Sequence, residues 1–349
     1  MTSTRPSDTV ATPLRHSTEF AELTKLIKEA GLLKRRRVYY LVRISLNLLA
    51  FAGGWVAFVH LGNSWWQLLL AAFFAMMFTQ LSFIGHDAGH KQIFRSHRAN
   101  NATGFLHGGL VGMSYGSWVS VHTKHHANPN HEDSDPDVDI AALAFSRAQG
   151  HGKRGFLRWM AKYQAFIFFP LLLLEGLNLH VSGIQAIMKR DVKHRILESA
   201  LLLAHVTAYL TAVFVVLSPL TGIAFIAVHQ GLWGVYMGSS FAPNHKGMPM
   251  LSDGHGLDFL RKQVLTSRNV RGGPVTDFAL GGLNYQIEHH LFPGMARPNL
   301  KHAQVIVREF CARHQIDYAE CGWMRSYGYV LEHLHSVGAP LRAGATASP

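Results

Sequence analysis

The fold is decided by residues 65–90, which read WWQLLLAAFFAMMFTQLSFIGHDAGH. A run of roughly 20 apolar residues is long enough for a helix to cross a bilayer, and the two leading tryptophans suit a membrane interface. The run ends directly in His86 and His90, and a spacing of four places both imidazoles on one face of a helix. The stretch therefore predicts a membrane span that brings two potential metal ligands to one membrane surface.

Two more histidine clusters follow, HTKHH at 122–126 and QIEHH at 286–290. Neutral imidazole is the commonest nitrogen ligand for iron, zinc and copper. Seven histidines in three sets exceed the four ligands that one tetrahedral zinc takes. The pattern therefore predicts two metal ions that share a site. The expected ligands are His86, His90, His122, His125, His126, His289 and His290.

The composition indicates a membrane protein. Of 349 residues, 48% are hydrophobic and 15% are charged, whereas about a quarter of a soluble domain is charged. The formal charge of +12 would suggest nucleic acid in a soluble protein. Here the basic residues lie between long apolar runs, where membrane orientation and anionic lipid explain them. We expect no nucleic-acid partner, and no signal peptide in the polar opening MTSTRPSDTV.

Four apolar stretches are predicted to span the membrane, and the placement of basic residues sets their direction. The basic run 34–37 precedes the first span and marks the cytoplasmic side. A further apolar stretch, 164–181, contains proline, glutamate and asparagine, so we expect it to lie in the interface or re-enter. Both termini and all three clusters then lie in the cytoplasm. The predicted spans are 39–61, 64–85, 196–217 and 220–241.

The fold class that follows is an all-α integral membrane protein with four transmembrane helices. A cytoplasmic helical cap, with amphipathic helices after Ser17 and over 298–318, holds the histidine-rich site. We expect one domain over 16–335, with disordered tails at 1–15 and 336–349.

Two other classes of protein deserve comparison. The pattern His-Asp-x-x-His resembles the His-Glu-x-x-His of zinc proteases, but an intramembrane protease leaves the other two clusters unexplained. A non-catalytic membrane binding or transport protein would carry polar groups in the middle of its spans, whereas these clusters lie at span ends.

The neighbourhoods of the clusters, GHDAGH, HHANPNHEDSDPD and NYQIEHHLFP, resemble the membrane fatty acid desaturases. That family has three boxes of the form HxxxH, HxxHH and HxxHH or QxxHH. The resemblance covers Glu19 to about His314. It is greatest to bacterial acyl-CoA desaturases with glutamine at the start of the third box.

The resemblance implies a di-iron centre that uses O2 as co-substrate, held by the seven box histidines. It adds His245, at the end of the last span, as a ligand, and Gln286 as a weaker one. Oxygen activation requires a redox-active metal with open positions, which excludes zinc as the working ion. Side chains beside the boxes are expected to orient the ligand imidazoles. The candidates are Asp87, Asp133, Asp137, Asp277, Glu288 and Asn244.

The implied activity is desaturation, in which a cis double bond enters a long-chain acyl-CoA or acyl-lipid in the cell membrane. Hydroxylation on the same scaffold is the alternative. The chain has no HPGG haem motif, so we expect a separate ferredoxin or flavin/iron–sulfur reductase as electron donor. Basic residues such as Arg95, Arg261 and Arg268 could bind coenzyme A phosphates, although membrane orientation predicts basic residues there anyway.

Overall fold

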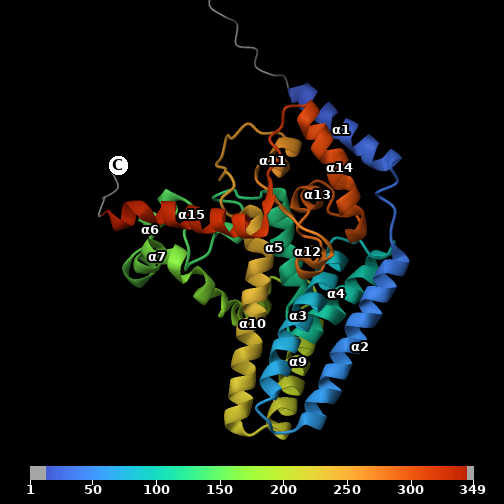
Figure 1. Ribbon diagram of the computed structural model, residues 1–349, viewed down its shortest axis with the longest axis vertical. Helices are drawn as coiled ribbons and strands as arrows, with labels where there is room; N and C mark the ends of the chain where they lie inside the picture. Colours follow the sequence, from blue (N-terminus) through green and yellow to red (C-terminus); the bar gives the residue numbers. More distant parts are fainter. Residues whose placement is uncertain (1–12, 344–349) are drawn as a thin grey trace, which may run out of the picture.

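Four long apolar helices form the lower half of the molecule (Figure 1). The computed structural model describes residues 13–343. Each helix is long and apolar enough to cross a membrane, which confirms the four predicted spans. They are α2 (Arg37–Leu61), α3 (Gln67–Gly89), α9 (Arg195–Val216) and α10 (Pro219–His245).

The two turns at the far end of the bundle are joined to each other. The Gln67 side chain donates to the carbonyl oxygens of Phe58 and Gly62, at 2.7 and 2.8 Å, which satisfies the end of α2. The Asn63 side chain accepts from the backbone N–H of Ser218 at 3.0 Å. Because Ser218 is the N-cap of α10, this bond holds the α2–α3 hairpin against the α9–α10 hairpin.

Within the bundle, α3 and α10 are central and α2 and α9 are peripheral. Much of α3 and α10 is buried, whereas most of α2 and α9 is exposed. Aromatic side chains fill the space between them: Phe74 lies edge-on to Phe51 and Phe225, with ring centroids 5.8 and 6.2 Å apart. The exposed faces carry large apolar side chains such as Leu41 and Val215, as expected for surfaces that contact lipid.

Two further helices connect the first hairpin to the rest of the chain. Helix α4 (His97–Val111) packs along α3, and α5 (Tyr115–Ala127) carries the second histidine cluster. Ser96 and Ser114 cap their N-termini. Helix α4 ends at Gly112 in the left-handed region, with φ of 73°.

The stretch predicted to lie in the interface, 164–181, is divided between two helices. Helix α7 (Gly155–Leu172) and α8 (Glu175–Met188) meet at an angle of 85°. Pro170 lies in the last turn of α7, where it removes a backbone hydrogen-bond donor shortly before the bend between α7 and α8.

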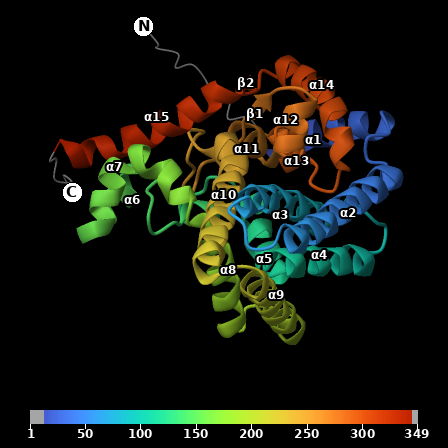
Figure 2. The ribbon, with the colours of Figure 1, turned by 60° about the horizontal axis from the view of Figure 1, so that its bottom comes forward.

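The upper half of the molecule is a cap of shorter elements above the ends of α3 and α10 (Figure 1). Helix α1 lies beside α14, and Leu23 and Ile27 of α1 pack with Val307 and Phe310 of α14. In Figure 2, α15 extends to one side with α6 and α7 beneath it. The cap elements are α1 (Pro13–Glu29), η1 (Pro136–Val138), α6 (Arg147–Gly152), α11 (Phe259–Leu265), α12 (Pro274–Ala279), α13 (Gln286–Leu291), α14 (Arg297–Arg313) and α15 (Trp323–Arg342), with the parallel strands β1 (Asn269–Arg271) and β2 (Glu320–Gly322).

The expected tails need correction at both ends. Helix α1 begins at Pro13 rather than after residue 15. Helix α15 continues to Arg342, so residues 336–342 are helical rather than disordered. The physical reason is an apolar stripe on α15, in which Val330, Leu334 and Leu341 are buried. The remaining tail residues, 1–12 and 344–349, lie outside the described part of the chain.

Candidate metal centre

The three histidine boxes meet where the spans enter the cap. The first box ends α3, the second lies on α5 and the third on α13, while His245 ends α10. Their imidazoles form two adjacent groups whose ligand nitrogens all lie within 4.8 Å of one another inside each group. One group is His86, His90, His122 and His289, and the other is His125, His245 and His290.

The remaining box residue, His126, lies between the two groups. Its ring is 4.6 Å from that of His90 in the first group. It stacks on His290 of the second group, with centroids 4.2 Å apart. The two groups of imidazoles are therefore adjacent, with the His126 ring in contact with both.

Gln286 lies beside the second group. Its amide nitrogen is 2.9 Å from Nε2 of His245, and its amide oxygen accepts from the Asn244 side chain at 3.2 Å. A half-turn of the amide group about its last side-chain bond would bring its oxygen towards His245. The side chain can therefore present an oxygen to an ion held by His245.

Hydrogen bonds hold Nδ1 of several imidazoles, which is the ring nitrogen on the outer side of each group. Nδ1 of His125 lies 3.0 Å from both carboxylate oxygens of Asp135. Nδ1 of His245 lies 3.0 Å from the carbonyl oxygen of Thr266, and Nδ1 of His290 lies 2.9 Å from the Gln263 amide oxygen. Each bond favours a proton on Nδ1, which leaves Nε2 free to bind a metal.

Several of the ring nitrogens that face the centre of the two groups have no protein partner. Nε2 of His86, Nε2 of His290 and both ring nitrogens of His289 are buried without a hydrogen bond. Buried polar atoms are normally satisfied, so unpaired nitrogens that converge from separate helices fit a bound cation. The donor set of imidazoles suits a transition metal such as iron.

Electrostatics keeps most of these imidazoles in the neutral, metal-binding form. Burial, with help from neighbouring imidazoles, lowers the pKa of His122, His126, His289 and His290 well below the usual value. His125 differs: burial lowers its pKa, but the carboxylates of Asp137 and Asp135 raise it by more.

Asp87 connects the first group to the cap. Its carboxylate lies 3.2 Å from Nδ1 of His86 and 2.6 Å from the guanidinium of Arg297, the first residue of α14. All three side chains are buried. Burial lowers the pKa of Arg297, but Asp87, Tyr39 and Tyr40 together raise it by more, so the guanidinium stays charged. The ion pair therefore fixes the position of α14 relative to the metal ligands.

The other side chains expected to orient ligands have varied surroundings. Asp137 lies 3.5 Å from Nδ1 of His125, and Asn244 bonds to Gln286. Asp277 accepts from Asn284, and Glu288 accepts from Asn269 and Tyr318. Asp133 is exposed, and its backbone N–H donates to His131.

Three hydrogen-bond partners of the imidazoles were not predicted from the sequence: Asp135, Gln263 and the backbone of Thr266. The available signal for Asp135 was its place before Pro136, because an aspartate before proline commonly caps a helical turn. Its side chain does accept from the backbone N–H of Asp137 and Asn130. No local pattern marked Gln263, which lies on α11 and meets α13 only in the folded protein.

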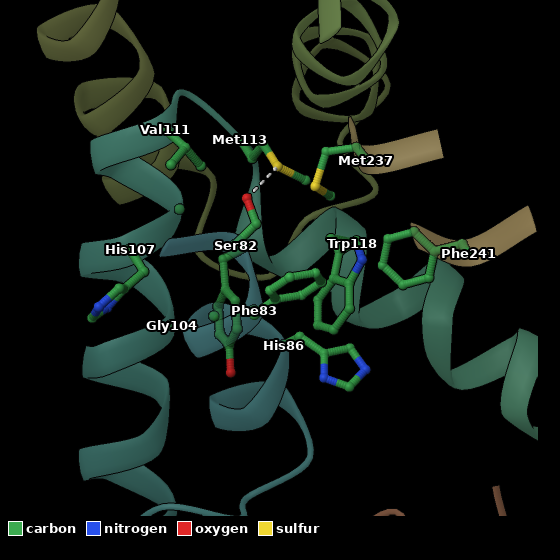
Figure 3. Close-up of a pocket in the computed structure, with 13 residues that line it drawn as sticks. Ser82, Phe83, His86, Gly104, His107, Val111, Met113, Trp118, Met237 and Phe241 are labelled. Atoms are coloured by element: carbon green, nitrogen blue, oxygen red, sulfur yellow. Dashed lines mark hydrogen bonds between the residues drawn. The ribbon is translucent and has the colours of Figure 1, made fainter. Parts of the chain in front are cut away.

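An apolar pocket reaches the first group of histidines (Figure 3). His86 lies at one end, and Val111, Met113 and Met237 lie at the other. Trp118 stacks on His122 with centroids 4.6 Å apart and an interplanar angle of 22°, so it links the pocket wall to the ligands. The remaining lining residues are Ser82, Phe83, Gly85, Gly104, His107, Gly108, Tyr115 and Phe241.

Close packing makes this pocket narrow. An added Cβ at Gly104 would lie 2.2 Å from the Tyr115 ring, and one at Gly108 would lie 3.0 Å from the carbonyl oxygen of Met113. Glycine at these two positions of α4 lets the α5 aromatic side chain approach the helix backbone. The aromatic side chains of α5 therefore form part of the pocket wall.

Fold and site together define a multi-pass membrane protein with histidine clusters suited to binding two metal ions. The family model described as fatty acid desaturase matches residues 63–322. The chain belongs to the fatty acid desaturase family, which confirms the resemblance of the three boxes.

Curated relatives agree with this family. An acyl-lipid (9-3)-desaturase of Physcomitrium patens is 30% identical over 332 residues, which cover 91% of this chain and 62% of the relative. The fatty acid desaturase 2-like protein FADS2B of Mus musculus is 25% identical, with coverage of 90% and 66%. The Delta(6)-fatty-acid desaturase fat-3 of Caenorhabditis elegans is 26% identical, with coverage of 93% and 76%. The chain thus spans less than two thirds of the length of the first two relatives.

Proposed function

We propose that this protein is an O2-dependent fatty acyl desaturase that introduces a cis double bond into a long-chain acyl-CoA or acyl-lipid. The observation that carries the proposal is the meeting of two groups of buried imidazoles, several with unpaired inner nitrogens, at the end of an apolar pocket. Two iron ions bound there would supply the activation of dioxygen that removal of two hydrogens from a methylene pair requires.

The eight histidines would hold the metals, with Gln286 as a weaker ligand. Asp135, Asp137, Gln263 and the Thr266 carbonyl would orient the second group, and Asp87 would orient His86. Holding each imidazole in one tautomer fixes the direction of its free lone pair.

The pocket residues would position the substrate. Trp118 and Phe241 line the pocket close to His86 (Figure 3), and they would keep water away from the reacting methylenes. Because the pocket is narrow, an acyl chain would be held in one register relative to the metals, which is a proximity effect. The depth between His86 and Met113 would set which carbons react.

The basic segments support a cytoplasmic site with both termini inside the cell. Run 34–37 precedes α2 and segment 188–195 precedes α9, and both helices start at the cap end (Figure 1). An excess of lysine and arginine marks the cytoplasmic ends of spans. Electrons would come from a donor outside these 349 residues, a ferredoxin or a flavin/iron–sulfur reductase.

Expression in a host of defined lipid composition tests the proposal. New double bonds mapped by mass spectrometry, dependent on O2 and on iron, are the expected result. An acyl product that gains an oxygen atom instead would replace desaturation by hydroxylation, and an iron-free protein with full activity would refute the metal centre.

A further inference from the structure

A second pocket lies outside the metal centre, at the junction of the spans and the cap. It opens between the start of α2 and the connection from α3 to α4, and one apolar residue, Leu33, lines it. The other lining residues are all cationic: Lys34, Arg35, Arg37 and Arg95. We call this feature the basic pocket.

The positive charge of the basic pocket has no counter-charge in the described protein. Among residues 13–343, no carboxylate lies within 4.0 Å of these four cationic groups. Two other basic residues of the cap do have partners: Arg261 pairs with Glu19 and Asp258, and Arg268 is buried and donates to backbone carbonyls. Four cations gathered in one concavity repel each other, so an anion bound among them would relieve that repulsion.

Membrane orientation alone does not explain this arrangement. The positive-inside effect predicts an excess of lysine and arginine along the cytoplasmic ends of spans. It does not require that Arg95 converge with residues 34–37, almost sixty positions earlier, on one pocket. The convergence is fixed by a specific contact, in which the Arg35 guanidinium donates to the carbonyl oxygen of Lys91.

That contact joins the basic pocket to the metal centre. Lys91 directly follows the ligand His90 and has φ of 59°, in the left-handed region that non-glycine residues rarely adopt. Its ammonium group donates to the Asn101 side chain and lies 3.4 Å from the hydroxyl of Tyr115. Tyr115 lines the apolar pocket. A chain of contacts therefore leads from the basic pocket through Lys91 to the acyl site.

On the basis of the proposed function, we propose that the basic pocket binds the phosphate group of the acyl carrier. Arginine forms paired, charge-assisted hydrogen bonds with phosphate oxygens, and lysine adds a point charge. With its phosphate held there, a substrate would extend its acyl chain past Tyr115 into the apolar pocket. The phosphate could belong to a membrane lipid or to coenzyme A, since both offer the same chemistry.

Equilibrium binding to the purified full chain in neutral detergent tests this inference. The probes are coenzyme A, a lysophosphatidylglycerol with a twelve-carbon chain, and monolaurin, which has the same acyl chain but no phosphate. Arg37→Gln combined with Arg95→Gln removes two charges and spares the structural contact of Arg35. Lys189→Gln combined with Lys193→Gln is the matched control, because both lysines are exposed in the basic turn before α9.

At least one phosphate-bearing probe should bind about tenfold more weakly to the Arg37/Arg95 variant. Monolaurin should bind equally to all proteins, and the lysine control should match the wild type. An effect on the lysolipid alone identifies a membrane lipid as the source, and an effect on coenzyme A alone identifies the soluble carrier. The inference would be overturned if the wild type and the Arg37/Arg95 variant bound each phosphate probe with equal affinity. It would also be overturned if neither phosphate probe bound to the wild type.

Two further sets of variants test whether the loss of affinity comes from the loss of positive charge. Arg37→Lys with Arg95→Lys retains the charge and should restore most of the affinity, and the single variant Arg95→Gln should show a smaller loss in the same direction. Because binding is measured without turnover, a protein that binds phosphate as expected but forms no double bond refutes the proposed function alone. A desaturase with unchanged affinities refutes this inference alone.

Discussion

Asp135 and His125 form the closest carboxylate–imidazole contact of the metal centre, with both carboxylate oxygens 3.0 Å from Nδ1. Asp135 is itself held by the backbone N–H groups of Asn130 and Asp137. Burial raises the pKa of Asp135, but His125, the backbone N–H of Asp137 and Lys246 together lower it by more, so the carboxylate stays ionised. The aspartate thus fixes an imidazole on α5 through the loop that follows the helix.

Asp135→Asn should therefore weaken the centre without removing a ligand. We expect iron affinity or turnover to fall by about 10- to 100-fold, the usual cost of losing an outer partner of a metal-bound histidine. Iron content and product formation are measured together on purified protein. Asp139→Asn, an exposed position on the same loop, is the control, and equal values for both variants would contradict the role of Asp135.

Removal of a single ligand should have a larger effect. His125→Ala or His290→Ala is expected to abolish turnover and reduce bound iron, because each imidazole supplies one of few nitrogens to its group. The protein should still insert in the membrane. His302→Ala on the exposed face of α14 should behave as wild type. Retained turnover in either ligand variant would refute the assignment.

Two substitutions of Gln286 can distinguish a role in metal binding from a role in packing. Gln286→His should be tolerated, since an imidazole beside His245 can still face the second group. Gln286→Leu has similar size but no polar atom, so it should lose iron and leave the Asn244 side chain with one partner fewer. Iron retention is compared in the two variants. Complete loss of activity in Gln286→His would show that the amide has a specific role.

The far end of the apolar pocket should determine substrate length. Met237→Trp would shorten the space opposite His86, so the longest acyl chains should lose turnover first. Competition between substrates of different length, read by mass spectrometry, measures the shift. Leu232→Trp, on the exposed surface of the same helix, should leave the preference unchanged. An unaltered length profile in Met237→Trp would argue against this end of the pocket.

A polar contact inside the bundle should matter for stability rather than for chemistry. Tyr209 of α9 and His229 of α10 are buried, with the hydroxyl 2.8 Å from Nδ1 of the imidazole. Tyr209→Phe should lower the free energy of unfolding by about 0.6 kcal/mol, the average for such bonds within membranes, and by no more than about 1.7 kcal/mol, the largest value. Thermal unfolding in detergent measures the loss, with lipid-facing Val215→Ala as the control. An unchanged midpoint would show that the bond adds nothing.

The sequence alone determined the four spans, the mostly helical fold and the family. Spans are readable because a bilayer demands about 20 apolar residues and internal hydrogen bonding, whatever the rest of the chain does. The box histidines were readable for a similar reason, since spacings of three and four express themselves within one helix. The amphipathic helix over 298–318 was likewise predicted, and it corresponds to α14.

Only the tertiary structure decided how the boxes divide into two groups and what holds them. His86 joins His289, and His125 joins His245 and His290, across separations of more than one hundred residues. Gln263 reaches His290 because α11 packs against α13, and the carbonyl of Thr266, just after α11, reaches His245 at the end of α10. The basic pocket likewise requires α2 to meet the loop before α4. Such contacts depend on packing between distant segments, which leaves no periodic trace in the local sequence.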